Sequence, residues 1–157
     1  MIEDSEFRRV MGHFATGVAV VTTLRPDGRP CGATVSAVSA VSLVPTLLLV
    51  CLDHASESNR ALAQFGSFAV NVLEEGTGEA LARRFAGKED KFQDVPYRRE
   101  ATGAPVLDDA LAWMDCRVTQ AFPAGDHTIY VGEVMAADAH PGTPLVYYRG
   151  GYGRLGP

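Results

Sequence analysis

The sequence predicts a mainly β fold, an antiparallel barrel with a few short helices at its ends. About six or seven apolar, β-branched runs follow one another along the chain, a pattern typical of neighbouring antiparallel strands. Turn-forming stretches rich in Pro, Asp and Gly join several of these runs. The helical patterns are short, and they do not alternate with the strands in the strict order of a parallel sheet.

The chain begins with a predicted amphipathic helix. Its apolar side chains recur at the spacing of one helical face, at Phe7, Val10, Met11 and Phe14. Asp4 and Ser5 stand at the start of this helix and are candidate N-caps. Gly17 breaks the pattern, so we expect the helix to end before it.

A hairpin and a buried strand are predicted next. Residues 18–24 form a β-branched run, the turn "RPDGRP" follows, and residues 32–42 form the partner strand. The next run, 46–53, is almost continuously apolar and rich in Leu and Val. Such a run is typical of a strand that is buried on both faces.

Two short helices flank the following strand. The first helix is predicted over 56–65 with Ser56 or Ser58 as its N-cap, and the strand over 67–73. The second helix is predicted over 77–87, with its first residue, Thr77, as the cap and its last, a glycine, as the end.

The last part of the chain combines a loop with three strands. Residues 88–105 are polar and irregular, which predicts a long surface loop of the kind that often covers a functional site. Strands are predicted over 110–122, 127–137 and 144–148. The tail "RGGYGRLGP" is expected to have little regular structure.

Length, charge and cysteine content exclude several classes of protein. A chain of 157 residues suits one domain, predicted over 1–157. The net charge is −5 and the densest basic cluster is Arg98–Arg99, which argues against nucleic-acid binding. The longest apolar run, 44–52, is too short to cross a membrane, and the N-terminus lacks the character of a signal peptide. The three cysteines are widely spaced without a CxxC pair, so a reduced, cytoplasmic location is expected.

Common catalytic motifs do not emerge from the sequence. There is no G-x-S-x-G motif, no P-loop and no dinucleotide fingerprint, and the four histidines lack the spacing of metal ligands. Asp126 and His127 are adjacent at the start of a predicted strand. Because neighbouring side chains on a strand point to opposite faces, these two residues are not expected to act as a dyad.

Two segments have alternative interpretations. The small residues of "ATVSAVSAVS", from Ala33 to Ser42, would let a flat ring or a phosphate approach the backbone, or they would simply fill a tight barrel. The stretch "CLDHASESN", residues 51–59, runs from a strand end to a helix start. Backbone amides at such a position suit an anion, but its serines also suit ordinary helix caps.

Five segments, in this order, resemble the short-chain flavin reductases, the reductase partners of two-component flavin-dependent monooxygenases. They are "FRRVMGHFATGVAVVTT", "GATVSAVSAVSLVPTLLLVCLDHASESNRAL", "FAVNVL…LARRFAG…KF", "AGDHTIYVGEV" and "PLVYYRGGYGRL". The resemblance implies a homodimeric split β-barrel of the Greek-key, FMN-binding type. It also implies that NADH or NADPH reduces FMN or FAD by hydride transfer from nicotinamide C4 to flavin N5. The reduced flavin would then reach a separate monooxygenase, and the protein's task would be to orient the two rings.

The resemblance also assigns roles to individual residues. Flavin contacts fall on two stretches, Thr34, Val35, Ser36, Ala37 and Val38, and Cys51, Leu52 and Asp53. Ser56 and Asn59 match the stretch near the flavin phosphate, and Arg84 and Phe85 match the helix end near the flavin tail. His127 is expected to orient the nicotinamide without acid–base chemistry, and Tyr152 to lie at the same mouth.

Some features remain open at the level of sequence. Many relatives have Ser and Phe where this chain has Ala37 and Val38, so contacts there would come from the backbone. The phosphates would be neutralised by one or more of four basic residues, Arg60, Arg83, Arg84 and Lys88, and the "KEDKF" loop would partly cover the flavin. A 2′-phosphate of NADPH would need an arginine, for which Arg98 and Arg99 are candidates.

Two other functions remain as alternatives to the reductase. One is a flavin-binding or flavin-storage module without turnover. The other is an enzyme like pyridoxamine-phosphate oxidase, which would need a basic pocket for the phosphate of its second substrate. The preference between FMN and FAD, and between NADH and NADPH, is not predicted, nor is whether the flavin stays bound or diffuses.

Overall fold

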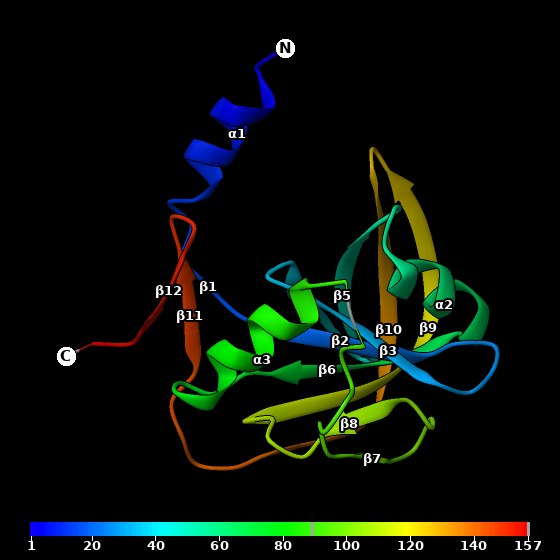
Figure 1. Ribbon diagram of the computed structural model, residues 1–157. Coiled ribbons are helices and arrows are strands. Elements are labelled where there is room, and N and C mark those ends of the chain that lie inside the picture. The colour runs from blue at the N-terminus through cyan, green and yellow to red at the C-terminus, as the bar shows by residue number, and fades with distance from the viewer. Residues whose placement is uncertain (89, 157) are drawn as a thin grey trace.

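An antiparallel sheet of seven strands forms the body of the protein in the computed structural model, which describes residues 1–88 and 90–156. The strands are ordered β3-β2-β6-β9-β10-β5-β4 across the sheet (Figure 1). Their bounds are β2 (Ala19–Leu24), β3 (Pro30–Val35), β4 (Val38–Leu43), β5 (Thr46–Asp53), β6 (Ser67–Val72), β9 (Ala112–Ala124) and β10 (His127–Ala139). The mainly β prediction is confirmed.

Smaller elements surround this sheet. The helices are α1 (Asp4–Met11), α2 (Glu57–Phe65) and α3 (Thr77–Ala86). One small sheet joins β1 (Thr16–Gly17), β11 (Leu145–Tyr148) and β12 (Gly151–Arg154), and another joins β7 (Tyr97–Arg99) and β8 (Pro105–Leu107). In Figure 1, α1 projects from the body next to the β11–β12 hairpin, and both chain termini lie on that side.

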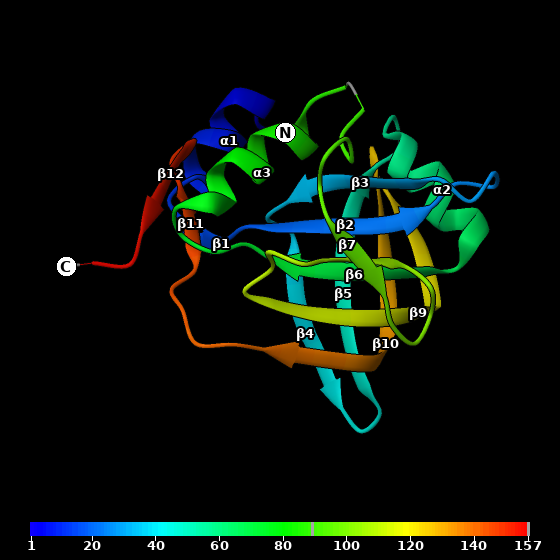
Figure 2. The same ribbon diagram turned by 60° about the horizontal axis from the view of Figure 1, so that its bottom comes forward.

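The main sheet curls around a hydrophobic core. In Figure 2 the strands β4 and β5 run steeply across the direction of β2, β3 and β6. The long strand β10 allows this bend through register shifts at Val131/Gly132 and Val134/Ala136, because bulges increase local twist and curvature. Val21, Val50 and Phe68, which come from both arms of the curled sheet, meet in one buried cluster. The sheet is therefore a partly open barrel.

Two strand predictions need correction. The run 32–42 is not one strand: β3 ends at Val35 and β4 begins at Val38, at the opposite edge of the sheet. The chain crosses over at Ser36 and Ala37, where the Ala37 carbonyl accepts the Cys51 N–H at 3.2 Å. Strand β5 is also not buried on both faces, since buried and partly exposed residues alternate along it. The face of β5 that points away from the core carries Leu47, Leu49 and Cys51, and it is only partly covered in the single chain.

Helix caps differ from the sequence predictions in two of three cases. Neither Asp4 nor Ser5 caps α1, whose N-cap position is Glu3 and has no side-chain cap. The N-cap position of α3 is Gly76, at φ 86°, and Thr77 lies inside the helix. Ser56 does cap α2, and its Oγ accepts the Asn59 N–H at 3.0 Å. A cap requires a particular backbone geometry, which the residue type alone does not determine.

The two segments expected to be irregular contain strands. Residues 97–99 form β7, which pairs with β8 directly after the predicted loop, and the tail contains β12, which pairs with β11. Each of these strands forms because it pairs with a neighbouring strand, and its own residues do not have the pattern of a strand. Glu89, part of the expected covering loop, lies outside the described residues. Among the residues that the structure describes, no helix has the length and hydropathy needed to cross a membrane.

Candidate functional site

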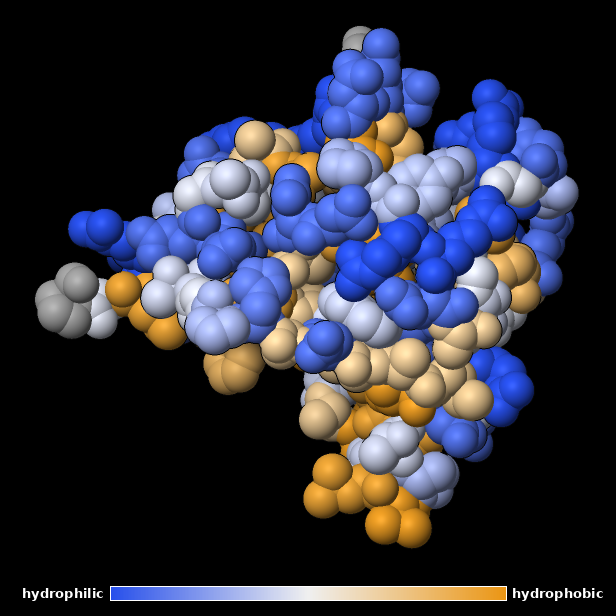
Figure 3. Space-filling view, turned by 90° about the horizontal axis from the view of Figure 1, so that it is seen from below, coloured by the Kyte–Doolittle hydropathy of each residue, from blue (hydrophilic) through white to orange (hydrophobic). Residues whose placement is uncertain are grey.

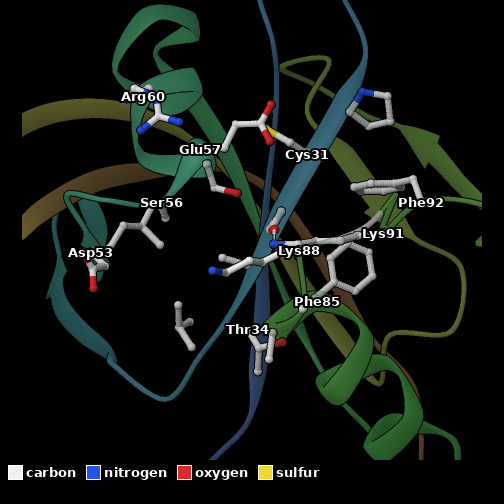
Figure 4. Close-up of a pocket in the computed structure, with 18 of the residues that line it drawn as sticks. Cys31, Thr34, Asp53, Ser56, Glu57, Arg60, Phe85, Lys88, Lys91 and Phe92 are labelled. Carbon is white, nitrogen blue, oxygen red and sulfur yellow. Dashed lines mark hydrogen bonds between the residues drawn. The ribbon is translucent and has the colours of Figure 1, made fainter.

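A large cleft of about 1170 Å³ opens along the free edge of β3. It is bounded by β3 and the crossover after it, the end of β5, the start of α2, the end of α3, residues 87–88 and residues 90–93 (Figure 4). Within the described residues β3 is the last strand of its sheet, so backbone groups on its outer edge face the cleft. This volume is sufficient for a nucleotide-sized ligand.

One wall of the cleft is neutral and closely packed. The Thr34 Oγ1 donates a hydrogen bond to the Ala82 carbonyl at 2.6 Å, which joins β3 to α3. Phe85 is fully buried behind this wall, and its ring packs against Gly32. A Cβ at Gly32 would lie 3.2 Å from two ring carbons, so glycine permits this close approach. A rigid wall without charge suits an aromatic ring system.

The start of α2 contributes polar groups to the cleft. Ser56 lines the cleft while it caps the helix, and Asp53 accepts the Ala55 N–H at 2.8 Å. The N-terminus of a helix presents backbone N–H groups and a partial positive charge. Arg60, from the first turns of α2, also lines the cleft. This corner therefore suits an anion such as a phosphate.

Basic side chains outnumber acidic ones along the cleft. The basic residues lining it are Arg25, Arg29, Arg60, Lys88 and Lys91, and the acidic residues are Asp53, Glu57 and Asp90. Sequence reasoning identified Arg60 and Lys88 as candidates but missed the other three basic residues. Arg25 and Arg29 lie in the β2–β3 turn, between two of the recognised segments, and Lys91 belongs to the "KEDKF" loop that was expected to cover the flavin. No local pattern marked these three residues as partners for a phosphate.

Three of these basic groups have protein partners. Arg25 Nε lies 2.7 Å from the Glu57 carboxylate, and Arg29 Nε lies 3.0 Å from Asp27. Lys91 Nζ donates to the Gly32 carbonyl at 2.9 Å, and partial burial lowers the pKa of its ammonium group. Arg60 makes only a long hydrogen bond, 3.4 Å, to the Ala55 carbonyl. In Figure 4 the side chains of Arg60 and Lys88 extend toward the open cleft.

Aromatic contacts hold residues 90–97 against the cleft. The Phe92 ring meets Phe85 edge-on at 5.0 Å and Tyr97 at 5.3 Å between ring centroids. The Arg84 guanidinium donates to the Gln93 carbonyl, which ties the same segment to α3. The segment is thus a packed wall of the cleft, as Figure 4 shows for Phe85, Lys91 and Phe92.

Asp126 and His127 form a hydrogen-bonded pair at the edge of the cleft. The His127 Nδ1 lies 2.7 Å from the Asp126 Oδ1, which corrects the expectation that the two side chains diverge. Asp126 belongs to the two-residue turn before β10, where the alternation of a strand does not apply. The hydrogen bond with His127 lowers the pKa of the Asp126 carboxyl. Of the two residues, His127 lines the cleft.

Most of the residues predicted for the site lie together. Ten of them line the cleft: Thr34, Val35, Ser36, Ala37, Cys51, Leu52, Asp53, Ser56, Phe85 and His127. Val38 packs against the core at the start of β4, and the Asn59 Oδ1 accepts a hydrogen bond from the Tyr130 hydroxyl at 2.6 Å. Arg84 holds Gln93 instead of lining the cleft.

Tyr152 and the candidate arginines for NADPH lie elsewhere. Tyr152 lines a separate cleft of about 260 Å³, with the Arg83 guanidinium 5.1 Å from its ring centroid. Arg98 is paired with Glu100 at 2.8 Å and with Asp108 at 3.2 Å, and neither Arg98 nor Arg99 lines the main cleft. Arg98 therefore has a structural role in the single chain. No group of three or more His, Cys, Asp or Glu side chains suits a metal ion among the described residues.

Comparison with known proteins assigns the family. The model of the flavin reductase like domain matches residues 11–156. The chain belongs to this flavin-reductase-like family. A family member from Kitasatospora aureofaciens named flavin reductase (NADH) is 46% identical, over 98% of this chain and 83% of its own length. The reductase component of a 4-nitrophenol monooxygenase from Rhodococcus opacus is 42% identical, over 99% and 83%.

Solved structures of flavin-reductase-like proteins have the same fold. The NADH:FAD oxidoreductase SgcE6 of Streptomyces globisporus superposes with a TM-score of 0.91 at 34% identity, over 100% of this chain and 98% of the other. A second structure of that protein contains NAD and FAD fragments. The family thus includes a member crystallised with both types of nucleotide.

The residues of the cleft fit a flavin. Its neutral wall, formed by β3 and by Cys51, suits the ring system, and its cationic corner at Arg60, Lys88 and Ser56 suits the phosphate. Backbone groups at the β3 edge supply hydrogen-bonding partners for the polar edge of the ring.

Proposed function

We propose that the protein is an NADH-dependent flavin reductase that reduces free FMN or FAD for a separate monooxygenase. The single observation that carries this proposal is the cleft, in which a neutral wall, a cationic corner and His127 converge. The names of the relatives support it, since one is a flavin reductase (NADH) and another is a monooxygenase reductase component. NADPH is kept as the alternative donor.

Each part of the cleft has a distinct task in this reaction. Thr34 and its neighbours on β3, with Cys51, hold the flavin ring, and Arg60, Lys88 and the start of α2 neutralise its phosphate. The flavin, when bound, supplies the electron-accepting ring that receives a hydride from the nicotinamide. The protein contributes orientation and exclusion of water, with Phe85 and Phe92 supporting the inner wall.

His127 is the proposed positioning group for the nicotinamide. It lines the cleft at the start of β10, directly across the sheet ladder from Asp53. The ring is less than half exposed and is held by Asp126, so it offers a fixed hydrogen-bonding group to an incoming ligand. Its role in orientation, and the contacts proposed for the other site residues, stay predictions.

The reductase is distinguished from two alternatives by turnover. A flavin-storage module would bind flavin without oxidising NADH, and an enzyme like pyridoxamine-phosphate oxidase would oxidise a phosphorylated amine. The reductase names of the relatives favour turnover with NADH. A reduced, cytoplasmic location is proposed because Cys31, Cys51 and Cys116 are all free thiols.

A kinetic matrix tests the proposed function. NADH and NADPH are each assayed against riboflavin, FMN and FAD, with absorbance of the reduced nicotinamide as the readout. We expect rapid oxidation only when a flavin is supplied, and faster oxidation with NADH. If neither nicotinamide is oxidised with any of the three flavins, the proposal is wrong. Tight flavin binding without turnover would instead favour the storage module.

We further propose that the protein works as a homodimer. Large apolar side chains are exposed in the single chain on α1 and just after it, on β4 and the β4–β5 turn, and on β9 and β10. They are Phe7, Val10, Met11, Phe14, Val41, Leu43, Val44, Phe122 and Met135. In Figure 3 apolar residues, coloured orange, gather where the β4–β5 turn protrudes at the bottom of the view. A second copy would cover this surface and the uncovered face of β5. Because β5 also supplies Cys51 to the cleft, we expect the flavin to lie near the subunit interface.

A further inference from the structure

The Asp126–His127 pair determines which nitrogen of the imidazole faces the cleft. An ionised carboxylate only accepts hydrogen bonds, so the His127 nitrogen that lies 2.7 Å from Asp126, Nδ1, carries the proton. In the neutral ring the other nitrogen, Nε2, then has a free lone pair. Neutral imidazole in water prefers the opposite arrangement, with the proton on Nε2. Asp126 therefore selects the less common tautomer.

The backbone fixes the position of the Asp126 carboxylate. Gly125 and Asp126 form the two-residue turn between β9 and β10, since Ala124 pairs with His127. Gly125 has φ 62°, which a type II′ turn requires at its first position and which glycine adopts without strain. The Asp126 carbonyl accepts the His54 N–H at 2.9 Å, which anchors the turn to the end of β5. The carboxylate is thus held beside its neighbour by the hairpin.

Other titratable groups near the pair leave this arrangement intact. Asp53 lies opposite His127 in the ladder, but its carboxylate accepts the Ala55 N–H. The side chain of His54 affects the pKa of the Asp126 carboxyl only through its charge, and that effect is smaller than the hydrogen bond with His127. Asp126 itself does not line the cleft, so it acts on a ligand only through His127.

We propose that Asp126 is a positioning residue that makes His127 Nε2 a hydrogen-bond acceptor for the carboxamide N–H of the nicotinamide. This inference rests on the proposed function of the cleft. The dihydronicotinamide ring carries a carboxamide whose NH2 group has two donors. A hydrogen bond from this group to a fixed Nε2 orients the ring in the cleft. The Asp126–His127 pair recognises an N–H donor and transfers no proton.

The first test uses a substrate that lacks the donor. Reduced 3-acetylpyridine adenine dinucleotide has a methyl group in place of the carboxamide NH2. The preference for NADH over this analogue, as a ratio of kcat/KM values, is measured for the wild type, Asp126→Ala and Asp126→Asn at mildly alkaline pH. Differences in intrinsic reactivity cancel when the ratios of two variants are compared. We expect Asp126→Ala to lower the preference about fivefold, as for the loss of one neutral hydrogen bond.

The matched controls separate this effect from charge and from folding. Asp109→Asn removes one exposed carboxylate outside the cleft and is expected to leave the preference unchanged. Asp126→Asn keeps an oxygen that accepts from Nδ1–H and is expected to retain part of the preference. An unchanged preference in Asp126→Ala would overturn the proposal, as would an equal loss in the Asp109→Asn control.

The second test does not depend on turnover. The 15N chemical shifts of the imidazole nitrogens report which of them is protonated. We expect His127 of the wild type to carry its proton on Nδ1, and His127 of Asp126→Ala to shift toward the Nε2–H form. A wild-type ring protonated on Nε2 would overturn the proposal even in an active enzyme. If the wild type fails to oxidise NADH with any flavin, the proposed function is wrong, and these spectra still decide whether Asp126 selects the tautomer.

Discussion

His127 shows how a single residue acquires its role from its neighbours. In the sequence it is one of four scattered histidines, and isolated histidines are more often structural than functional. In the fold it lies at the first position of β10, lines the cleft and is held by Asp126. The contact between the two side chains is possible because Asp126 belongs to a turn and not to the strand.

Replacing His127 separates nicotinamide binding from flavin binding. We expect His127→Ala to raise the KM for NADH about fivefold and to lower turnover, since one orienting hydrogen bond of about 1 kcal/mol is lost. Flavin affinity, measured by fluorescence titration, should stay nearly unchanged because the neutral wall and the cationic corner are intact. His140→Ala, outside the cleft, serves as the control. Weakened flavin binding with normal NADH kinetics would contradict the assignment.

The acid titration of Asp126 provides a second check at the residue scale. The folded state lowers the pKa of this carboxyl, mainly through the hydrogen bond with His127. The stabilisation is therefore present above the ordinary pKa of an aspartate and is lost as the pH falls through the lower, folded value. In a 13C NMR titration we expect the Asp126 midpoint below that of a free aspartate, and a higher midpoint in His127→Ala. Equal midpoints in both proteins would argue against the contact.

The elements around the cleft come from distant parts of the chain. The edge strand β3 supplies the neutral wall, α2 supplies its N-terminus, and residues 90–97 close one side. Phe85 of α3 connects these parts, because its buried ring contacts both Gly32 and Phe92. Segment 90–97 is therefore a packed wall of the site, where the sequence predicted an irregular loop that partly covers the flavin.

Weakening the wall formed by residues 90–97 should affect both stability and flavin binding. Phe92→Ala removes edge-on contacts with Phe85 and Tyr97, and we expect a loss of about 1–3 kcal/mol in the free energy of unfolding. Flavin affinity should fall in parallel, since Phe92 lines the cleft. Urea unfolding and fluorescence titration measure the two effects.

Phe92→Leu is the matched variant for this experiment. It retains apolar volume but not the aromatic geometry, so we expect intermediate values for both stability and flavin affinity. Normal flavin affinity in a destabilised Phe92→Ala protein would show that this segment packs against the core without contributing to the flavin site.

At the scale of the whole molecule, the single chain leaves a large apolar surface exposed to water. Leu43 and Val44 at the β4–β5 turn are 86% and 92% exposed, which is unusual for large apolar residues in a stable monomer. The apolar face of α1 is exposed as well. A homodimer would bury these residues and remove the cost of their contact with water.

A charged residue at the β4–β5 turn tests this proposal. We expect Leu43→Glu to shift the protein from dimer to monomer in sedimentation velocity experiments, because it would place an unpaired charge in the interface. The fold of each chain should persist in circular dichroism spectra, since Leu43 packs little within its own chain. Leu155→Glu, an exposed leucine in the C-terminal tail, is the control. A monomeric wild type would contradict the proposed dimer.

Local patterns identified most of the strands but only one of the three helix caps. Runs of β-branched residues predicted β2 and β6 almost to their ends, because a strand with buried side chains needs such residues along its length. The cap of α2 was also predicted, since Ser56 lies directly before a helical pattern. The caps of α1 and α3 were not, because neither helix has a side-chain cap and the backbone geometry places their N-cap positions at Glu3 and Gly76.

By itself the sequence determined the mainly β class, the family resemblance and ten of the residues that line the cleft, because these depend on local composition and on the order of motifs. Only the tertiary structure decided that the run after Gly32 divides between two sheet edges, that Arg25 and Lys91 join the cleft, and that Asp126 holds His127. Those outcomes depend on which distant backbone segments meet when the sheet curls. Pairing across the sheet and the geometry of a tight turn are properties of the folded chain, and no local pattern encodes them.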